Sequence, residues 1–410
     1  MRLTVAVLAA SLPLTAYAQD YPTFRGTNRD GHSPDKGLAK EWPAGGPPLA
    51  WKIKGIGGGY GGVSTLGDKL FLLGDKEGQT LLHCLNAADG KIAWSAPVGK
   101  EHSEGNQEWK GNRATPTTDG KVIIALGPMG ELVCFDLAGK EKWRKNLHKD
   151  FGGKVGGWKY SESPLIDGDH VVCVPGGGKG AVLALKKDSG DPVWQCAEFT
   201  DAAEYASLVA VELGGVRQYV AFTQKSVAGV AAKDGKLLWR ADFPGKTAVI
   251  PTPIIKDDIV FVAAGYGVGH AAYKITATDG KFSAAELYNG KEMKNHHGGV
   301  ILVGDHLYGC TDNNQLVCLE LKTGKQVWAD KGVDKGSLAY ADGLLVARSE
   351  KKSKGTIVLV EASPAGYKEK GRFEQPDLSG MPTWPHPTIA GGHLYIRDQD
   401  TLLCYGIKAK

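Results

Sequence analysis

The sequence predicts an all-β fold, an eight-bladed β-propeller of four-stranded antiparallel blades. Two repeated phrases and the two chain ends carry this prediction. The first phrase runs from a strand through a short acidic or glycine turn to an aromatic residue, and the second is an apolar hairpin that precedes it. Copies of the first phrase are 40 to 51 residues apart, a period typical of propeller blades or solenoid units.

The first phrase appears as CLNAADGKIAW, CFDLAGKEKW, ALKKDSGDPVW, GVAAKDGKLLW and CLELKTGKQVW, and a diverged copy has Tyr288 in place of Trp. Each Trp follows a glycine turn near a strand end, where its ring can cover the neighbouring blade and its N–H can find a backbone acceptor. We therefore predict a structural role for the repeat tryptophans, which are Trp51, Trp94, Trp143, Trp194, Trp239 and Trp328.

The second phrase consists of two apolar β-rich runs joined by an Asp/Gly turn, which predicts a hairpin. No helical-period segment lies between the hairpins, and four-stranded units repeated radially are propeller blades. Eight hairpins are expected, starting near Val63, Thr115, Ser163, Ser207, Thr252, Gly299, Ser337 and His386.

The two ends of the chain predict closure of the ring. The last unit stops after residues 401–405 and lacks its final strand, while a matching strand, Leu49-Ala50-Trp51-Lys52-Ile53, stands near the N-terminus. Pairing of these N- and C-terminal strands would complete the eighth blade and remove exposed sheet edges. The sequence thus predicts a single propeller over residues 48–410.

Residues 1–18 have the pattern of a cleaved signal peptide. Arg2 precedes an apolar stretch that is too short to span a bilayer, and Ala16-Tyr17-Ala18 matches an A-x-A cleavage site. No Cys follows that site, so we expect a periplasmic or secreted protein with neither a lipid anchor at that end nor a transmembrane segment. Residues 19–47 are then a lead-in that we expect to pack on the propeller.

Composition restricts the partners of the protein. The 49 Lys and Arg residues nearly balance the 45 Asp and Glu residues, and a net charge of +4 does not predict nucleic-acid binding. The 57 glycines disfavour a helical bundle, because glycine weakens a helix interior. We expect a monomer.

Seven cysteines in an exported protein would ordinarily suggest disulfides. Cys84, Cys134, Cys318 and Cys404, however, occupy equivalent positions of different repeats, so we expect them to be small buried apolar residues that do not pair with one another. Cys310 and Cys318 flank one turn, and a disulfide between them is left open.

The Trp phrase resembles the tryptophan-docking repeat of the pyrroloquinoline quinone (PQQ) propeller family. The matching positions are Cys84/Asn86/Gly90/Trp94, Ala184/Lys186/Gly190/Trp194 and Cys318/Glu320/Gly324/Trp328, with Asp136/Gly139/Trp143 one residue shorter. The family includes quinoprotein alcohol dehydrogenases and the propeller lipoprotein of the BAM complex, both eight-bladed. The resemblance covers nearly the whole mature chain and implies the fold, but the motif residues pack blades together and do not indicate an activity.

Candidate ligand-binding residues follow from the propeller geometry, since the innermost strands line a central channel. Aligning the inner strands gives one position per blade near the channel mouth: Tyr60, Arg113, Ser161, Tyr205, Ile250, His297, Lys335 and Trp384. Beside them lie Asn112, Tyr160, Glu162, Glu204, His296, Gly298 and His386. From both sets we select as candidate ligand-binding residues Tyr60, Arg113, Tyr160, Glu162, Tyr205, His296, His297, Lys335, Trp384 and His386.

This ring mixes aromatic and cationic groups, which suits an anionic, planar or carbohydrate-like ligand. No metal site is predicted. His296 and His297 are adjacent and, on a strand, would point to opposite faces.

The leading hypothesis is an exported platform without redox activity that binds a cell-envelope protein or a small anionic or carbohydrate ligand. The resemblance implies an alternative, a dehydrogenase of alcohols or sugars that uses PQQ with calcium or a lanthanide. Such enzymes commonly have an adjacent Cys pair and a cluster of oxygen ligands, and this sequence has neither a Cys-Cys pair nor an Asp-x-Asp cluster near the aligned positions. A cell-envelope assembly scaffold is a third hypothesis. No catalytic residue is assigned.

Overall fold

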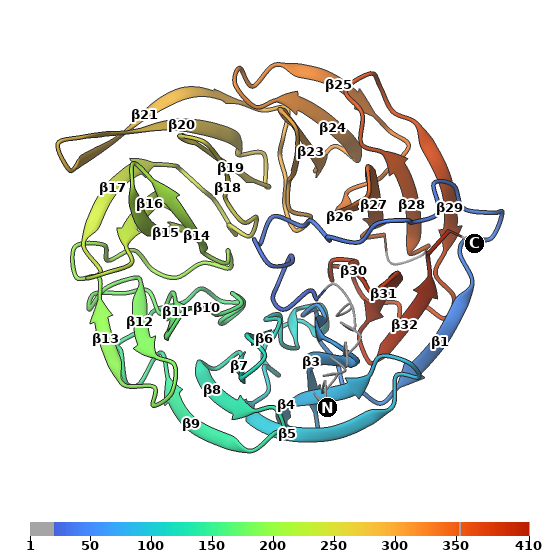
Figure 1. Ribbon diagram of the computed structural model, residues 1–410, viewed down its shortest axis with the longest axis horizontal. Helices are drawn as coiled ribbons and strands as arrows, with labels where there is room; N and C mark the ends of the chain where they lie inside the picture. The colour runs from blue at the N-terminus through green and yellow to red at the C-terminus, as the bar shows by residue number, and fades with distance from the viewer. Residues whose placement is uncertain (1–19, 352–353, 410) are drawn as a thin grey trace, which may run out of the picture.

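The computed structural model describes residues 20–351 and 354–409, so the predicted signal peptide lies outside the described residues. Within them the chain forms eight four-stranded sheets arranged around a central axis (Figure 1). This arrangement confirms the predicted eight-bladed propeller. In the described part of the chain no helix is long and apolar enough to cross a membrane.

Blades 1 to 4 follow one another along the chain, each with its strands in sequence order from the centre outward (Figure 1). Blade 1 contains β2 (Ser64–Leu66), β3 (Lys69–Lys76), β4 (Gln79–Asn86) and β5 (Ile92–Lys100). A short 3₁₀ helix, η1 (Gln107–Trp109), leads to blade 2, which contains β6 (Thr117–Thr118), β7 (Val122–Leu126), β8 (Glu131–Asp136) and β9 (Glu141–Asn146). Blade 3 contains β10 (Leu165–Asp167), β11 (His170–Cys173), β12 (Leu183–Lys186) and β13 (Pro192–Gln195). Blade 4 contains β14 (Val209–Leu213), β15 (Val216–Phe222), β16 (Ser226–Ala231) and β17 (Leu237–Asp242).

Blades 5 to 8 complete the circle. Blade 5 contains β18 (Ile254–Lys256), β19 (Ile259–Ala264), β20 (Gly269–Thr278) and β21 (Lys281–Gly290). Blade 6 contains β22 (Ile301–Val303), β23 (His306–Thr311), β24 (Gln315–Glu320) and β25 (Gln326–Asp330). Blade 7 contains β26 (Gly336–Ala341), β27 (Leu344–Ser349), β28 (Thr356–Glu361) and β29 (Glu369–Glu374). Blade 8 contains β30 (Thr388–Ala390), β31 (His393–Asp398), β32 (Thr401–Gly406) and β1 (Leu49–Lys54).

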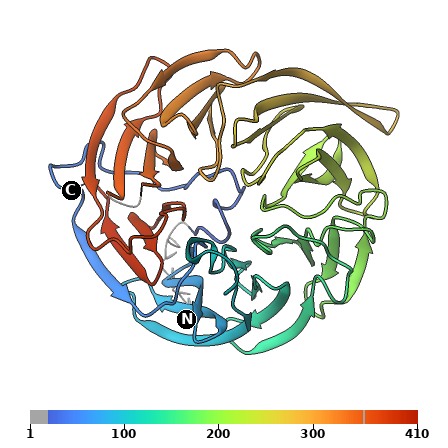
Figure 2. The same cartoon turned by 180° about the vertical axis from the view of Figure 1, so that it is seen from behind.

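Strand β1 closes the ring as the outermost strand of blade 8. It pairs antiparallel with β32, with Trp51 opposite Cys404 and Lys52 opposite Leu403. Figure 1 shows these two ends of the propeller side by side, and Figure 2 shows the same closure from behind. The predicted pairing of the N- and C-terminal strands is therefore confirmed, and it satisfies the sheet edge that β32 would otherwise expose.

Consecutive blades are joined by an aromatic ring that lies over the turn glycine of the next blade. Trp94 of blade 1 covers Gly139 of blade 2 so closely that a Cβ on this glycine would lie 2.6 Å from the ring. Gly139 also has a φ of +84°, a left-handed conformation that side chains disfavour. Four other junctions repeat this contact, in the pairs Trp51/Gly90, Trp143/Gly190, Trp194/Gly235 and Tyr288/Gly324.

Indole N–H groups donate a hydrogen bond across several of the junctions between blades. Those that reach a carbonyl of the next blade, at 2.6 to 3.1 Å, are Trp51 to Ala87, Trp143 to Lys187, Trp194 to Ala232 and Trp328 to Ser363. Trp239 differs, because it donates to Gln218 Oε1 of its own blade at 2.6 Å. The hairpin of β20 and β21 is ten residues long on each side, so its turn lies beyond Trp239.

The lead-in lies across the central channel, as the blue segment at the centre of Figure 1 shows. Its two arginines donate hydrogen bonds to backbone carbonyl groups of three different blades. Arg29, which is 1% exposed, donates to Pro164 O at 2.5 Å and to Leu208 O at 3.0 Å. Arg25 donates to Val300 O at 2.5 Å. These bonds tie the lead-in to blades 3, 4 and 6.

The seven cysteines are buried and unbonded. The strand register explains why the disulfide that the sequence left open does not form. Cys310 lies opposite Leu316, while Cys318 lies opposite Tyr308, so the two thiols are not cross-strand partners.

Substitution Gly139→Ala should destabilise the propeller more than Gly343→Ala. Gly343 has a nearly identical φ of +85° but no atom within 4 Å of its would-be Cβ. In both variants an alanine in the left-handed conformation lowers the free energy of unfolding by about 1–2 kcal/mol. Only in Gly139→Ala must the new side chain also displace Trp94, which lowers it by about 1–3 kcal/mol more. Thermal melting of the two variants measures the difference, and equal losses would contradict the role assigned to the ring contact.

Substitution Arg29→Ala should lower the free energy of unfolding by about 3–5 kcal/mol, because it leaves buried polar partners unpaired. The exposed Lys36 of the same lead-in provides the control, and Lys36→Ala should change stability by less than about 0.5 kcal/mol. Urea unfolding of both variants tests this, and similar effects of the two changes would show that the lead-in does not stabilise the ring through Arg29.

Candidate functional site

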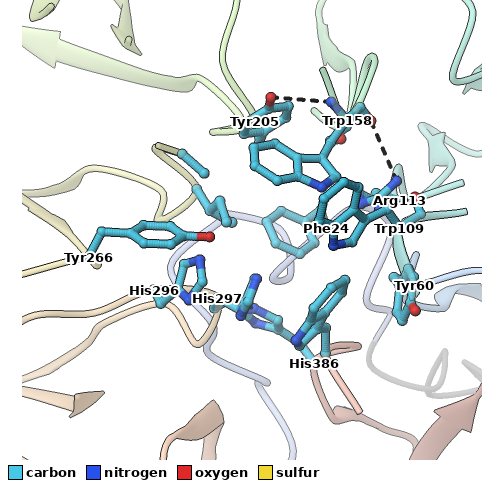
Figure 3. A pocket seen from close by; sticks show the side chains of 14 residues that line it. Phe24, Tyr60, Trp109, Arg113, Trp158, Tyr205, Tyr266, His296, His297 and His386 are labelled. Atoms are coloured by element: carbon cyan, nitrogen blue, oxygen red, sulfur yellow. Dashed lines mark hydrogen bonds between the residues drawn. The ribbon is translucent and has the colours of Figure 1, made fainter. Parts of the chain in front are cut away.

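A pocket of about 150 Å³ lies at the centre of the ring, next to Phe24 of the lead-in (Figure 3). The connections between blades build it, because each of them returns from an outer strand to the next inner strand and so passes the channel mouth. Seven of the eight aligned inner-strand positions line the pocket: Tyr60, Arg113, Ser161, Tyr205, Ile250, His297 and Trp384. His296 and His386, selected from the neighbouring positions, line it as well.

Aromatic rings form most of the wall. Trp384 stacks on His297 with ring centroids 4.6 Å apart and also packs against Tyr60 at 4.6 Å. Across the pocket, Trp158 meets Trp109 edge-on at 5.7 Å and Tyr205 edge-on at 5.8 Å. Figure 3 labels Tyr60, Trp109, Trp158 and Tyr205 among the side chains that line the pocket together with Phe24.

Arg113 is held by backbone carbonyl groups of the pocket loops. Its Nη1 donates to Gly111 O at 2.9 Å and to Trp158 O at 3.4 Å, and its Nη2 donates to Trp109 O at 2.5 Å. The guanidinium also lies over the ring of Tyr60 at 5.3 Å. Burial lowers the pKa of Arg113 to about 10, so the group stays charged at neutral pH. Its terminal nitrogens thus serve to hold the two tryptophan loops.

His296 and His297 lie side by side, with ring centroids 3.7 Å apart. The expectation that they point to opposite faces is wrong. It assumed a strand, whereas both residues lie in a bend of the connection between β21 and β22, where the alternation of side chains does not apply.

Lys335 lies behind this histidine pair and not in the pocket lining. Its Nζ is 2.6 Å from His296 Nδ1, 3.0 Å from Glu350 Oε1 and 3.3 Å from Asp312 Oδ1. Glu350 in turn binds His297 Nδ1 at 3.0 Å. Burial acts to lower the pKa of Lys335, but the two carboxylates outweigh it and raise that pKa.

His296, His297 and Glu350 place their ligand-type atoms within 4.8 Å of one another, as a divalent metal would need. The Lys335 ammonium contacts two of these three residues. A metal ion would have to displace this partly buried ammonium, so the three residues fit the Lys335 side chain better than a metal.

Burial lowers the pKa of all three pocket histidines. For His386 the pKa falls to about 3, and for His296 and His297 it also falls below the usual value. At neutral pH the three imidazoles are therefore uncharged, and each presents one N–H donor and one lone pair.

Two further selected residues lie outside the pocket lining. Tyr160 is buried and donates its hydroxyl to Pro175 O at 3.0 Å. Glu162 is 1% exposed, accepts from Val174 N at 2.5 Å, and its pKa is raised by burial to about 8. Tyr160 precedes the aligned position Ser161 by one residue and Glu162 follows it by one, and both side chains lie in the blade packing.

Sequence reasoning missed five lining residues: Phe24, Trp109, Trp158, Ala248 and Tyr266. None of them belongs to either repeated phrase. Trp109 and Trp158 lie in unusually long connections between blades, and a tryptophan outside the repeat pattern is the signal that could have found them. Tyr266 lies in the turn between β19 and β20, and Phe24 in the lead-in.

Comparison with known proteins finds a matching family model and a similar curated protein, and both have the same name. A family model described as outer membrane protein assembly factor BamB matches residues 78–330. A curated protein of that name from Shewanella oneidensis is 25% identical over 271 residues, which are 59% of this chain and 61% of the relative. The chain thus matches about three-fifths of the length of this relative.

Solved structures share the fold. BamB from Moraxella catarrhalis aligns with a TM-score of 0.63 at 13% identity, covering 88% of this chain and 100% of that one. A quinohemoprotein alcohol dehydrogenase from Comamonas testosteroni aligns with a TM-score of 0.61 at 9% identity, covering 96% and 81%. At such identities the likeness shows the fold and not the activity.

Substitution Glu162→Gln should change how stability depends on pH. The pKa of Glu162 rises from 4.5 to about 8 on folding, so its contribution to stability is fully present below pH 4.5 and is lost as the pH rises through about 8. The amide cannot ionise. Relative to the parent protein, the variant should therefore gain melting temperature between pH 5 and pH 8, and a constant difference across that range would contradict the raised pKa.

Proposed function

This chain belongs to the family of outer membrane protein assembly factor BamB, and from that membership we propose that it is a binding platform of the cell envelope. Its aromatic pocket captures a ligand or a group of a partner and does no redox chemistry. The observation that carries the proposal is the pocket itself, in which seven aromatic side chains from separate parts of the chain converge: Phe24, Tyr60, Trp109, Trp158, Tyr205, Tyr266 and Trp384.

The exposure of the rings supports a binding role. Trp109 and Tyr266 are 43% and 40% exposed at the pocket mouth, although large aromatic side chains gain most when buried. Each comes from a part of the sequence outside the repeated phrases, so blade packing does not require it. A concave, mostly apolar pocket with a few polar groups is the usual form of a ligand site.

An envelope location is supported by two independent features. The pattern of residues 1–18 is that of an exported protein. The relatives that match are named as outer membrane assembly factors. Their name also supports a protein partner in the envelope.

The alternative, a dehydrogenase with PQQ and calcium or a lanthanide, does not fit the residues of the pocket. Calcium binds through carboxylate and carbonyl oxygens, and among the described residues the lining contains no Asp, Glu, Asn or Gln. Glu350 is the nearest carboxylate of the histidine cluster, and it is already paired with His297 and Lys335. No step of a quinone reaction can be derived from these groups.

Site-specific photo-cross-linking in cells tests the binding role. A benzophenone side chain replaces Tyr266 at the pocket mouth or, as a control of similar exposure, Leu137 in the turn between β8 and β9. We expect an adduct in the envelope fraction at position 266 only, reduced at least tenfold by Trp384→Ala. Equal labelling at both positions, or no adduct at 266, would refute the proposal. An outer-membrane β-barrel protein in the adduct would favour the assembly scaffold.

Calorimetric titration of the purified protein with PQQ tests the absence of quinone chemistry. Calcium and a lanthanide are added in separate runs. The described lining offers no carboxylate or side-chain amide oxygen, which predicts no metal-dependent binding. Tight one-to-one binding that needs the metal would make the dehydrogenase the better assignment.

A further inference from the structure

Two of the three pocket histidines have their tautomers set by residues outside the pocket lining, Lys335 and Glu350. Lys335 Nζ can only donate, so its 2.6 Å contact makes His296 Nδ1 the acceptor and leaves the proton on Nε2. This Nε2 is buried beside Tyr266, whose ring centroid is 4.3 Å from that of His296, and it has no partner among the described residues. His296, which is 8% exposed, therefore keeps an unused N–H donor.

His297 has the opposite tautomer. Its Nδ1 lies 3.0 Å from Glu350 Oε2, and the pKa of that carboxyl is lowered, because the hydrogen bond from His297 and the charge of Lys335 outweigh its burial. An ionised carboxylate only accepts, so Nδ1 carries the proton and Nε2 keeps a free lone pair. One donor and one acceptor thus stand next to each other, on rings 3.7 Å apart.

His386 adds a second acceptor. Its Nε2 lies 2.7 Å from His297 O, which can only accept, so the proton is on Nε2 and the lone pair on Nδ1. Nδ1 is buried and has no hydrogen-bond partner in the described chain. The ring packs edge-on against Phe24 at 5.2 Å.

The charges of the site argue against a charged occupant. A carboxylate or phosphate would face the lone pairs of His297 and His386, while the terminal nitrogens of Arg113 already bind three carbonyl groups. A cation would find no carboxylate in the described lining and would lie near the positive Arg113. An apolar side chain would leave the buried donor and acceptors unpaired, which is costly.

A neutral sugar meets all of these conditions. Its ring offers apolar C–H faces to the aromatic walls, and its hydroxyl groups both donate and accept. Resting on the binding role proposed above, we infer that the pocket binds an uncharged pyranose, stacked against Trp384 or Trp158 and hydrogen-bonded to His296, His297 and His386.

Saturation-transfer NMR of the full protein tests this assignment. The probes are methyl glucopyranoside, methyl galactopyranoside and N-acetylglucosamine, each beside charged counterparts, namely glucuronate, galacturonate and glucosamine. At least one neutral sugar should bind, and its charged counterparts should bind at least tenfold more weakly. This comparison uses the unaltered protein, so it does not depend on the folding of a variant.

Variants then locate the site. Trp384→Ala and His297→Leu should each weaken binding of the neutral sugar at least tenfold. His306→Leu, on β23 and outside the pocket, should leave it unchanged. Melting temperatures show whether each variant is folded.

Three results would overturn the inference: no binding by any neutral sugar of the panel, tighter binding of the uronates, or binding that Trp384→Ala leaves intact. If the panel fails while the cross-linker at position 266 still captures an occupant, the binding platform stands and the pyranose assignment falls. If the cross-linker at position 266 captures a protein side chain in place of a sugar, the binding platform likewise stands and the pyranose assignment falls.

Discussion

The contact on which the structure depends is an aromatic ring lying over the turn glycine of the next blade. It recurs at five junctions, from Trp51 over Gly90 to Tyr288 over Gly324. Each ring fills the space that a side chain would need, so the glycine and the aromatic residue require each other. Because the contacts run in one direction around the circle, they set the spacing between blades, and β1 completes the circle by pairing with β32.

Closure of the ring has a consequence at its centre. Eight inner strands leave a channel, and buried backbone carbonyl groups near it need donors. The lead-in supplies them through Arg25 and Arg29, which reach Val300, Pro164 and Leu208. The same segment brings Phe24 into the pocket. The lead-in thus contributes both to the stability of the ring and to the shape of the site.

The site combines aromatic walls with the histidines His296 and His297, whose tautomers are set by residues outside the pocket lining. Lys335 and Glu350 do not line the pocket, yet they determine which nitrogen of His296 and His297 carries the proton. Burial keeps the imidazoles neutral, so they offer oriented hydrogen-bond donors and acceptors that carry no charge. This is the physical basis for favouring an uncharged, hydroxyl-rich occupant within a binding platform.

The sequence by itself determined the blade count, the closing strand and most inner positions of the pocket, because strand period and turn chemistry repeat along the chain. It also placed His296 and His297 at the channel, but it could not show that a bend turns both rings the same way. Trp109, Trp158 and Phe24 lie outside the repeated phrases, so the periodicity of the sequence could not predict their place in the pocket. Only the tertiary structure brought these loops and the lead-in together, since long-range packing, and not local pattern, decides where an irregular connection lies.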